Sequence, residues 1–366
     1  MARLYRCSES IRLFFCRMTM HGNLMAAAIL TASDSAYAAY AANRLLESPF
    51  GIKEIFGDSA FTDWKDHYRQ RIAELSAAIG EGEPNLFSAQ IDWAQSAFQS
   101  RQVPIEVLRQ SLICLSDVLF EELPESCRQE PVEYISLALE SLETTSDGPE
   151  ELKPDSKTSR MSLNYITMIL EGDGQSAIEL VVQALQEGMP VLAIYENVLL
   201  SAQQEVGRMW HLGDLSISEE HYVTATTIRA MGVLNYLSER QPKNGRTVVS
   251  AAVSGNIHDI GVRAVSDFFD LAGWRAVCLG GDTPAEDIAM AVGTFEADLL
   301  LVSAALTVQL KSVRDTIERI RQERDCKIMV GGMAFSGSPN IWRQMGADGF
   351  STSISESIET GHRLVS

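Results

Sequence analysis

The sequence predicts a multidomain protein of the α and α/β classes: an N-terminal helical bundle, a four-helix segment, then a doubly wound five-stranded parallel sheet. Three observations predict this order. Apolar side chains recur at helical spacing before residue 240, and a polar stretch at 144–159 interrupts them. From Arg246 onward, short apolar strands alternate with helices. The 366 residues are enough for two or three domains, each with a core.

Residues 1–31 are a poorly defined N-terminal segment. Arginines precede the apolar run Leu24–Leu30 and an AYA tripeptide, which together resemble a secretory signal peptide. The run is short and helix-like sequence follows at once, so we favour a start site assigned too early, with Met18, Met20 and Met25 as alternatives. No apolar stretch approaches the roughly 20 residues that span a bilayer, so no membrane association is expected.

Residues 32–143 are expected to form a bundle of four or five helices. In FTDWKDHYRQR, the offsets from Trp64 to His67, Tyr68 and Arg71 are three, four and seven, so these side chains can share one helix face. An aromatic stripe of this kind is usually core. The alternative is that the four side chains bind a ligand.

Two further helical and linking segments follow. Residues 144–159 are polar and contain two prolines and a glycine, which predicts a linker. Residues 160–240 predict four helices, with breaks at EGDGQS, EGMP and HLGDLSIS. Ser216 and Glu219 fit a capping box at the start of the last helix.

Residues 241–366 are expected to form a flavodoxin-like α/β domain. The predicted strands are RTVVSAAV, WRAVCLGG, ADLLLVSAA, CKIMVGG and ADGFST. Continuous apolar strands that alternate with helices indicate a buried parallel sheet. Such sheets bind ligands at the carboxyl ends of their strands.

Three loops at this edge carry residues suited to a bulky ligand. GNIHDIG follows the first strand and places His258 in the crevice, with Gly261 at the start of the next helix. SAALT follows the third strand and offers the hydroxyl of Ser303. GGMAF follows the fourth, where Gly331 and Gly332 allow close approach of the backbone. The alternative is that His258 is a capping or core residue of an ordinary doubly wound domain.

The three loops resemble the cobalamin-binding domain of corrinoid enzymes and sensors, whose signature is DxHxxG, then SxL, then GG. The resemblance implies that His258 is the lower axial ligand of cobalt, that Ser303 meets the displaced base of the cofactor, and that the glycine pair lines the slot for its tail. The cofactor-binding residues implied are Asn256, His258, Asp259, Gly261, Ser303, Leu306, Thr307, Gly331 and Gly332.

The chain departs from that signature at two positions. Asn256 stands where the family has aspartate, and Ala305 stands at the leucine of SxL, although Leu306 and Thr307 follow. The family aspartate holds the far imidazole nitrogen and sets its basicity. Asparagine can accept a hydrogen bond but carries no charge, so we expect a weaker cobalt–histidine bond.

The segment VGRMWHLGDLSISEEHYVTAT resembles the helical cap of CarH-type photoreceptors, which hold adenosylcobalamin. Their cap has Trp followed by Glu-His one helix connection later, as Trp210, Glu220 and His221 stand here. The resemblance implies that these side chains cover the adenosyl group, and that His211 binds cobalt from above after light breaks the cobalt–carbon bond. The alternative is that Trp210 is core and the other two are first-turn residues, where acidic side chains are common.

The N-terminal bundle is not expected to bind nucleic acid, because the net charge is −19 and no basic recognition helix is present. Its texture is similar to the helical module of photocobilins, in which a bilin lies beside cobalamin. That similarity implies biliverdin as a second cofactor, held by Trp64, His67, Tyr68 and Arg71. A role in dimerisation or in docking a partner is the alternative.

The resemblance therefore implies a cobalamin-dependent light sensor, not an enzyme, whose cap moves and changes its oligomeric state, dimer or tetramer, or its binding to a signalling protein. One alternative is a corrinoid methyl-carrier protein of a methyltransferase system. Another is a scaffold with a vestigial site. Six scattered cysteines form no CxxC pair, which favours a reducing, cytoplasmic location.

Overall fold

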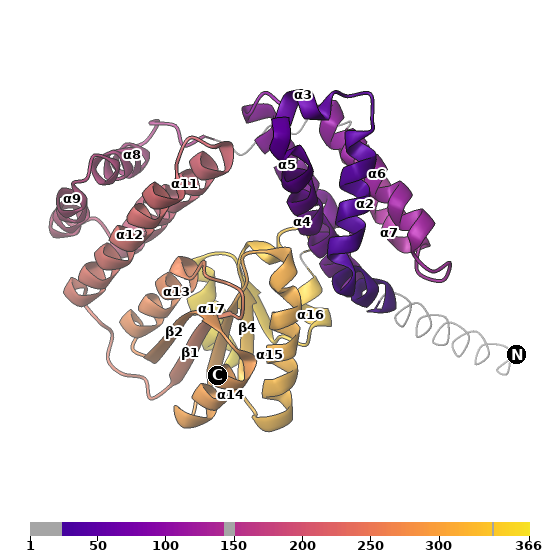
Figure 1. Cartoon of the computed structure of the whole chain (residues 1–366). Coiled ribbons are helices and arrows are strands. Elements are labelled where there is room, and N and C mark those ends of the chain that lie inside the picture. The colour runs from indigo at the N-terminus through magenta and orange to yellow at the C-terminus, as the bar shows by residue number, and fades with distance from the viewer. Residues whose placement is uncertain (1–23, 143–150, 339) are drawn as a thin grey trace, which may run out of the picture. The chain divides into compact units, whose positions relative to one another are not determined.

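The computed structural model describes residues 24–142, 151–338 and 340–366. The chain divides into two compact units, Met1–Gly148 and Pro149–Ser366, which we call unit 1 and unit 2. Their boundary falls inside the stretch expected to be a linker. Each unit is described separately (Figure 1).

Unit 1 is a helical bundle. Its helices are α2 (Asp34–Leu46), α3 (Ile52–Phe56), α4 (Ala60–Glu81), α5 (Pro84–Ser100), α6 (Ile105–Glu122) and α7 (Gln129–Ser141). Residues 24–32 are also helical, and Ala26 and Leu30 are buried, so the bundle includes part of the segment expected to be poorly defined. Tyr68 is fully buried on α4 and donates to the carbonyl oxygen of Ser111 on α6, 2.9 Å away.

Unit 2 begins with four helical stretches that we call the cap. They are α8 (Lys157–Leu170), α9 (Gly174–Gln186), the run α10 (Val191–Ile194), η2 (Tyr195–Leu200) and α11 (Ser201–Leu212), and α12 (Ile217–Leu237). Helix α8 begins within the expected linker because Ser156 caps it, accepting from the backbone N–H of Ser159. The predicted capping box of Ser216 and Glu219 at the start of α12 is confirmed.

A five-stranded parallel sheet follows the cap. Its strands are β1 (Thr247–Val253), β2 (Arg275–Thr283), β3 (Leu299–Ser303), β4 (Lys327–Gly331) and β5 (Gly349–Ser351). The order β2-β1-β3-β4-β5 confirms the doubly wound prediction. All seven residues of β1 are buried, because helices cover both faces of the sheet (Figure 1).

The connections between the strands are helical. They are α13 (Ile260–Leu271), α14 (Ala285–Thr294), η3 (Thr307–Gln309) with α15 (Leu310–Glu323), and η4 (Met333–Phe335) with α16 (Ile341–Gln344); α17 (Ile354–Leu364) ends the chain. The cap packs on α13, where Ala264 joins the apolar core of the cap and the rings of Phe268 and Tyr195 lie 5.0 Å apart. In the three described ranges, no helix is long and apolar enough to cross a membrane.

A buried hydroxyl also links the cap to the sheet domain. The phenol oxygen of Tyr195 lies 2.8 Å from the carbonyl oxygen of Met231 and 2.9 Å from Oδ2 of Asp267 on α13. A phenol has one proton to donate, so both contacts are hydrogen bonds only when the Asp267 carboxyl donates a proton of its own. Burial, reinforced by the charge of Asp270, raises the pKa of Asp267 to about 6, although the hydrogen bond with Tyr195 and the charges of Arg263 and Arg240 act in the opposite direction.

We expect the stability of unit 2 to depend on this proton. Because the pKa of Asp267 in the folded protein exceeds the ordinary 3.8, its contribution is fully present below that pH and is lost as the pH rises through about 6. Asp267→Asn should make the unfolding free energy fall less between about pH 4 and about pH 7 than it does in the wild type, as measured by urea denaturation. The exposed, Lys311-paired Asp315 provides the control Asp315→Asn, which should behave as the wild type. Equal pH dependence in both variants would contradict the assignment.

Candidate functional site

The loop between β1 and α13 presents His258 at the carboxyl edge of the sheet. The His258 side chain is exposed there, and so is that of its neighbour Ile257. The strand before the loop is fully buried and the helix after it packs on the cap. A rigid scaffold therefore holds an accessible imidazole.

Asn256 anchors this loop. It is fully buried, its Nδ2 donates to the carbonyl oxygen of Ser303 at the end of β3 (3.1 Å), and its Oδ1 accepts from the backbone N–H of His258 (3.1 Å). The first of these bonds needs an N–H donor, which an ionised aspartate lacks. The departure from the family signature thus has a structural use: the amide fixes the loop, and its oxygen is directed at the backbone of His258.

Residues at the end of β2 hold the other side of the loop. The backbone N–H of Gly255 donates to Oδ1 of Asp282 (2.7 Å), and the backbone N–H of Asp282 donates to the carbonyl oxygen of Asn256 (2.8 Å). Asp259 pairs with Arg263 one turn into α13, at 2.7 Å. This pair lies against Gly280, where a side chain would meet the guanidinium of Arg263.

A row of small residues crosses the sheet beside the loop. Ala252 on β1 pairs with Ser303 on β3, Ser303 with Gly331 on β4, and Gly331 with Ser351 on β5. Residues paired in register project from the same face of a parallel sheet. Two residues earlier on β3 and β4, the same face packs on Phe269 of α13. The predicted Ser303 and Gly331 therefore lie together, between the carboxyl edge and the helices that cover this face.

The predicted glycine pair is required by the backbone itself. A Cβ atom at Gly331 would lie 2.8 Å from the carbonyl oxygen of Ser351. At Gly332, φ is +105° and a Cβ atom would overlap the carbonyl oxygen of Ala304. Gly261 differs, because a Cβ atom there would meet no atom within 4 Å. Open space is thus present at Gly261, while the glycine pair permits close packing of the strand ends, and its role in lining a slot for the cofactor stays a prediction.

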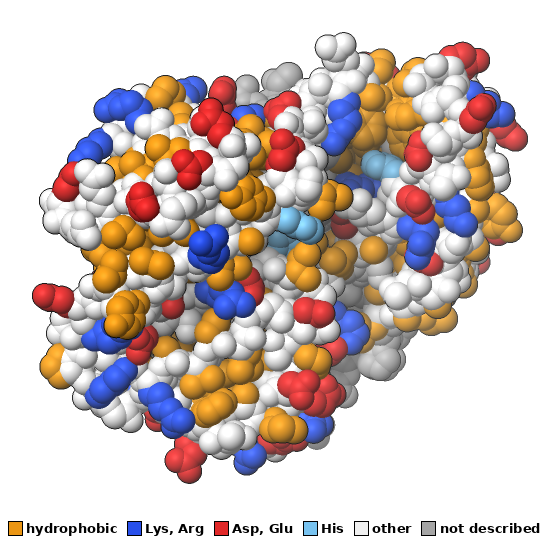
Figure 2. All heavy atoms as spheres, turned by 60° about the vertical axis from the view of Figure 1, so that its left-hand side comes forward, with side chains coloured by type: hydrophobic (Ala, Val, Ile, Leu, Met, Phe, Trp, Pro, Cys, Tyr) orange, Lys and Arg blue, Asp and Glu red, His pale blue; other side chains and the backbone are white. Residues whose placement is uncertain are grey.

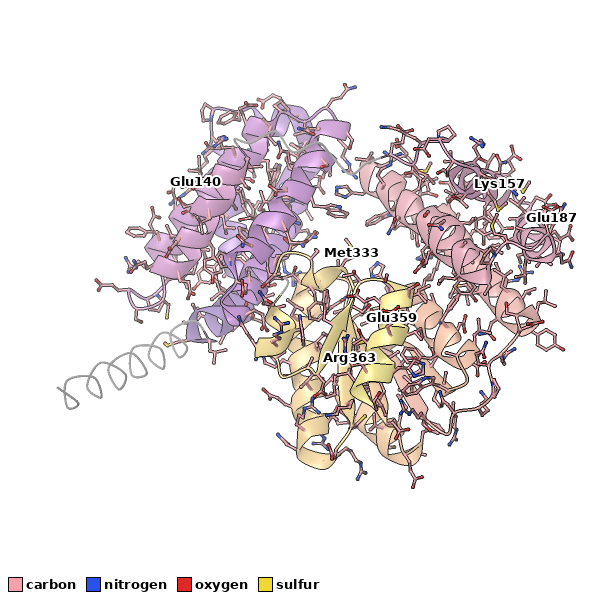
Figure 3. The ribbon with its side chains drawn as sticks, turned by 180° about the vertical axis from the view of Figure 1, so that it is seen from behind. Glu140, Lys157, Glu187, Met333, Glu359 and Arg363 are labelled. Carbon is pink, nitrogen blue, oxygen red and sulfur yellow. The ribbon has the colours of Figure 1, made fainter. Side chains whose placement is uncertain are left out.

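Apolar side chains are exposed around this edge. Ile257 follows β1 and is 72% exposed, Leu306 and Val308 follow β3 at 44% and 40%, and Met333 follows β4 at 71%. Figure 3 labels Met333 at this edge of the sheet. Thr307, between the two exposed side chains of the β3 loop, is buried. Exposed apolar side chains on three adjacent loops are typical of the rim of a site for a large organic ligand.

The cap places its four predicted residues at the connection of α11 and α12. Trp210 is 44% exposed at the end of α11, whereas the adjacent His211 is buried. Glu220 and His221 lie in the first turn of α12, with 3.6 Å between Oε2 and Nε2. Glu220 also accepts from the hydroxyl of Thr224 at 2.7 Å. The imidazole of His211 is therefore not presented at the surface of the cap in this conformation.

Unit 1 buries the stripe that the sequence singled out. Trp64, Tyr68 and Arg71 are buried, and the rings of Trp64 and His67 lie 5.0 Å apart. Arg71 is not free for an anionic ligand, because its guanidinium pairs with the equally buried Glu74 at 3.0 Å. Burial, with the charge of Arg71, lowers the pKa of His67 to about 3, so this imidazole is neutral.

Several buried polar atoms of this stripe have no hydrogen-bond partner. They are Nε1 of Trp64, Nε2 of His67 and Nε of Arg71, and Oε2 of Glu74, which pairs with Arg71, is a fourth such atom outside the stripe. Buried polar groups are normally paired, and each exception calls for an explanation. The stripe is therefore more than an apolar core.

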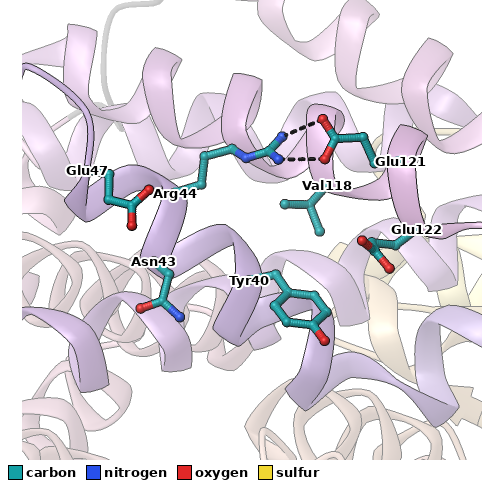
Figure 4. A pocket seen from close by; sticks show the side chains of 7 residues that line it. All are labelled: Tyr40, Asn43, Arg44, Glu47, Val118, Glu121 and Glu122. Carbon is teal, nitrogen blue, oxygen red and sulfur yellow. Dashed lines mark hydrogen bonds and ion pairs between the residues drawn. The ribbon is translucent and has the colours of Figure 1, made fainter.

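A separate hollow of about 230 Å³ lies on unit 1 between α2 and α6 (Figure 4). Its wall holds Arg44, which pairs with Glu121. Acidic and basic side chains are interspersed elsewhere too, as one face of the molecule shows (Figure 2). None of the residues that line this hollow belongs to the stripe or to the carboxyl edge of the sheet. We assign the hollow no function.

Sequence reasoning missed two side chains that shape the edge. Asp282 lies in the GGDTP segment, and Gln309 lies two residues beyond the Leu306-Thr307 pair. Both act by bonding backbone groups of the His258 loop. The one signal for Gln309 in the sequence was a polar residue between the apolar Val308 and Leu310. That signal did not indicate which backbone group its side chain would bond.

Comparisons with known proteins find family models for both the cap and the sheet of unit 2. A family model described as a B12 binding domain matches residues 246–358, which hold the sheet and its carboxyl edge. A second model, with the same description, matches residues 164–235 within the cap. Unit 2 is a B12-binding module. Both matches lie within unit 2.

Individual relatives of the B12-binding module are corrinoid proteins. One from Desulfitobacterium hafniense is 25% identical over 205 residues, which are 54% of this chain and 94% of that protein. Dimethylamine corrinoid protein 2 of Methanosarcina acetivorans is 28% identical over 193 residues, 50% of this chain and 87% of that protein. The solved monomethylamine corrinoid protein of Methanosarcina barkeri shares the fold, with a TM-score of 0.50 and 23% identity over 57% of this chain and 99% of that one.

The two kinds of glycine at the edge should respond differently to substitution. Gly332→Ala should lower the unfolding free energy by at least about 2 kcal/mol, because it adds backbone strain to an overlap with Ala304. Gly261→Ala should cost no stability, since α13 has open space there and alanine favours helix. Thermal and urea unfolding of the ligand-free protein measure both. Comparable losses in the two variants would contradict the packing described.

Proposed function

We propose that the protein is a corrinoid carrier, in which the B12-binding module holds cobalamin with His258 beneath the cobalt and presents the upper face to a partner protein for methyl transfer. The observation that carries the proposal is an exposed imidazole on a loop fixed from both sides, at an edge rimmed by apolar side chains. The relatives named for dimethylamine and monomethylamine support methyl transfer as the reaction.

The residues at the edge fit such a group. Cobalamin, when bound, would supply a cobalt ion that can accept and give up a methyl group, and the imidazole of His258 would be the protein ligand that holds it. The open space beside Gly261 allows a flat macrocycle to approach the start of α13. Ile257, Leu306 and Met333 offer apolar contact to its rim. Asn256 accepts a hydrogen bond from the backbone N–H of His258 and so holds the backbone of the loop. As an amide, Asn256 offers the imidazole of His258 no carboxylate partner.

His258→Ala should remove the lower ligand. We expect hydroxocobalamin to bind at least about tenfold more weakly, because one coordinate bond to the protein is lost, and the absorption spectrum of any bound corrinoid to change. His362→Ala is the matched control for loss of an imidazole: His362 accepts from Trp274 just before β2, at the opposite end of the strands from His258, and the variant should keep both the affinity and the spectrum. Unchanged affinity and spectrum in His258→Ala would count against the assignment.

A methyl carrier must also leave the upper face of cobalt open to reagents. After reduction of the bound corrinoid in the dark, methyl iodide should methylate it at a rate within about tenfold of free corrinoid, since only modest steric exclusion is expected. Protein-bound corrinoid that reacts very much more slowly would indicate a closed cap and would contradict the carrier role.

Light sensing through adenosylcobalamin is the second candidate, and one observation favours it: Trp210, His211, Glu220 and His221 gather at the α11–α12 connection. In that function, light would release the adenosyl group and His211 would leave its buried position to bind cobalt. Green light should then convert the spectrum of the adenosylcobalamin-loaded protein and change its sedimentation, and His211→Ala should abolish the stable product. If light changed neither the spectrum nor the sedimentation, light sensing would be ruled out and the carrier role would be the remaining candidate.

Biliverdin binding to unit 1 is a separate component of that second candidate. The unpartnered atoms of Trp64, His67 and Arg71 favour a polar ligand between α4 and α5, although Glu74 already neutralises the arginine. Added biliverdin should produce a far-red absorption band that is lost in His67→Ala.

The expectations of a homo-oligomer, of a signalling partner and of cytoplasmic location stay predictions.

A further inference from the structure

Gln309 links two loops of the carboxyl edge. Its side chain is 3% exposed at the end of η3. Oε1 accepts from the backbone N–H groups of Ala305 (2.8 Å) and Leu306 (3.0 Å), and Nε2 donates to the carbonyl oxygen of Gly255 (2.9 Å). One side chain therefore satisfies three backbone groups, two in the loop after β3 and one in the loop that carries His258.

The Gly255 carbonyl is the point at which the His258 loop needs support. Gly255 has a φ of +80°, a conformation open to glycine, and a Cβ atom there would meet no atom within 4 Å. Packing does not restrain it. Hydrogen bonds do: Asp282 holds its N–H from the β2 side and Gln309 holds its carbonyl from the β3 side.

We infer that Gln309 is a positioning residue for cobalamin, which sets the separation between the His258 loop and the Ser303–Leu306 loop before the cofactor arrives. The inference rests on the proposed binding of cobalamin by His258. A site whose walls are already fixed binds without the cost of ordering them. All three hydrogen bonds of the Gln309 side chain go to backbone groups of the two loops. Gln309 therefore acts by holding the loops and not by binding the cofactor.

Gln309→Glu is the sharpest variant. Its carboxylate can still accept from Ala305 and Leu306, but it has no N–H to donate to Gly255. Gln309→Ala removes all three bonds. The control is Thr316→Ala, which deletes a buried hydrogen bond within α15, from Oγ1 of Thr316 to the carbonyl oxygen of Ser312, away from the edge.

Two measurements on the full chain test the inference. In the ligand-free protein, amide hydrogen exchange at residues 254–260 should rise about tenfold in Gln309→Glu and stay at the wild-type rate in Thr316→Ala, since one hydrogen bond is worth about that factor. The dissociation constant for hydroxocobalamin should rise about tenfold in Gln309→Glu, and more in Gln309→Ala, with little change in Thr316→Ala.

The outcomes separate the two claims. Unchanged exchange in Gln309→Glu would overturn the link between the loops. Faster exchange with an unchanged dissociation constant would overturn the positioning role and leave the proposed function standing. A wild-type protein that binds no hydroxocobalamin, with the exchange result as expected, would refute the proposed function and with it the role of Gln309 toward cobalamin.

Discussion

The architecture of the candidate site depends on the anchoring of one loop by one buried amide. The Nδ2 group of Asn256, just after β1, donates to the carbonyl oxygen of Ser303 at the end of β3. Its Oδ1 accepts from the backbone N–H of His258. Its burial makes both bonds costly to lose, because an unpaired amide in the interior is penalised. Everything proposed for His258 presupposes that this loop is in place without the cofactor.

The sheet explains why the anchor lies where it does. Parallel strands end at one edge, so loops that are far apart in sequence become neighbours there. The His258 loop, the loop with Gln309 and the glycine pair converge in this way. The cap then packs against α13, the helix that leaves the His258 loop, and Tyr195 bonds Asp267 on it. The cap and the His258 loop are thus connected through the same helix.

Much of this could be predicted from the sequence, for physical reasons. Alternation of apolar strands and helices predicted the sheet, and the end of each strand predicted the edge on which His258 and Ser303 lie. The bonds from Asn256 to Ser303 and from Gln309 to Gly255 could not be predicted, because each reaches a backbone group about 50 residues away in the sequence and leaves no periodic trace. The burial of Arg71 with Glu74 was also missed, since helical spacing places two residues on a face without saying whether that face is covered.

The most direct test of the central claim is the electron paramagnetic resonance spectrum of the protein loaded with cob(II)alamin, with and without ¹⁵N-labelled histidine. The unpaired electron couples to the axial nitrogen, which splits each cobalt line into three for ¹⁴N and into two for ¹⁵N. If His258 is the lower ligand, labelling should convert triplets to doublets, and His258→Ala should abolish that response. Triplets that persist in the labelled wild-type protein would show that the base of the cofactor, and not this histidine, binds the cobalt.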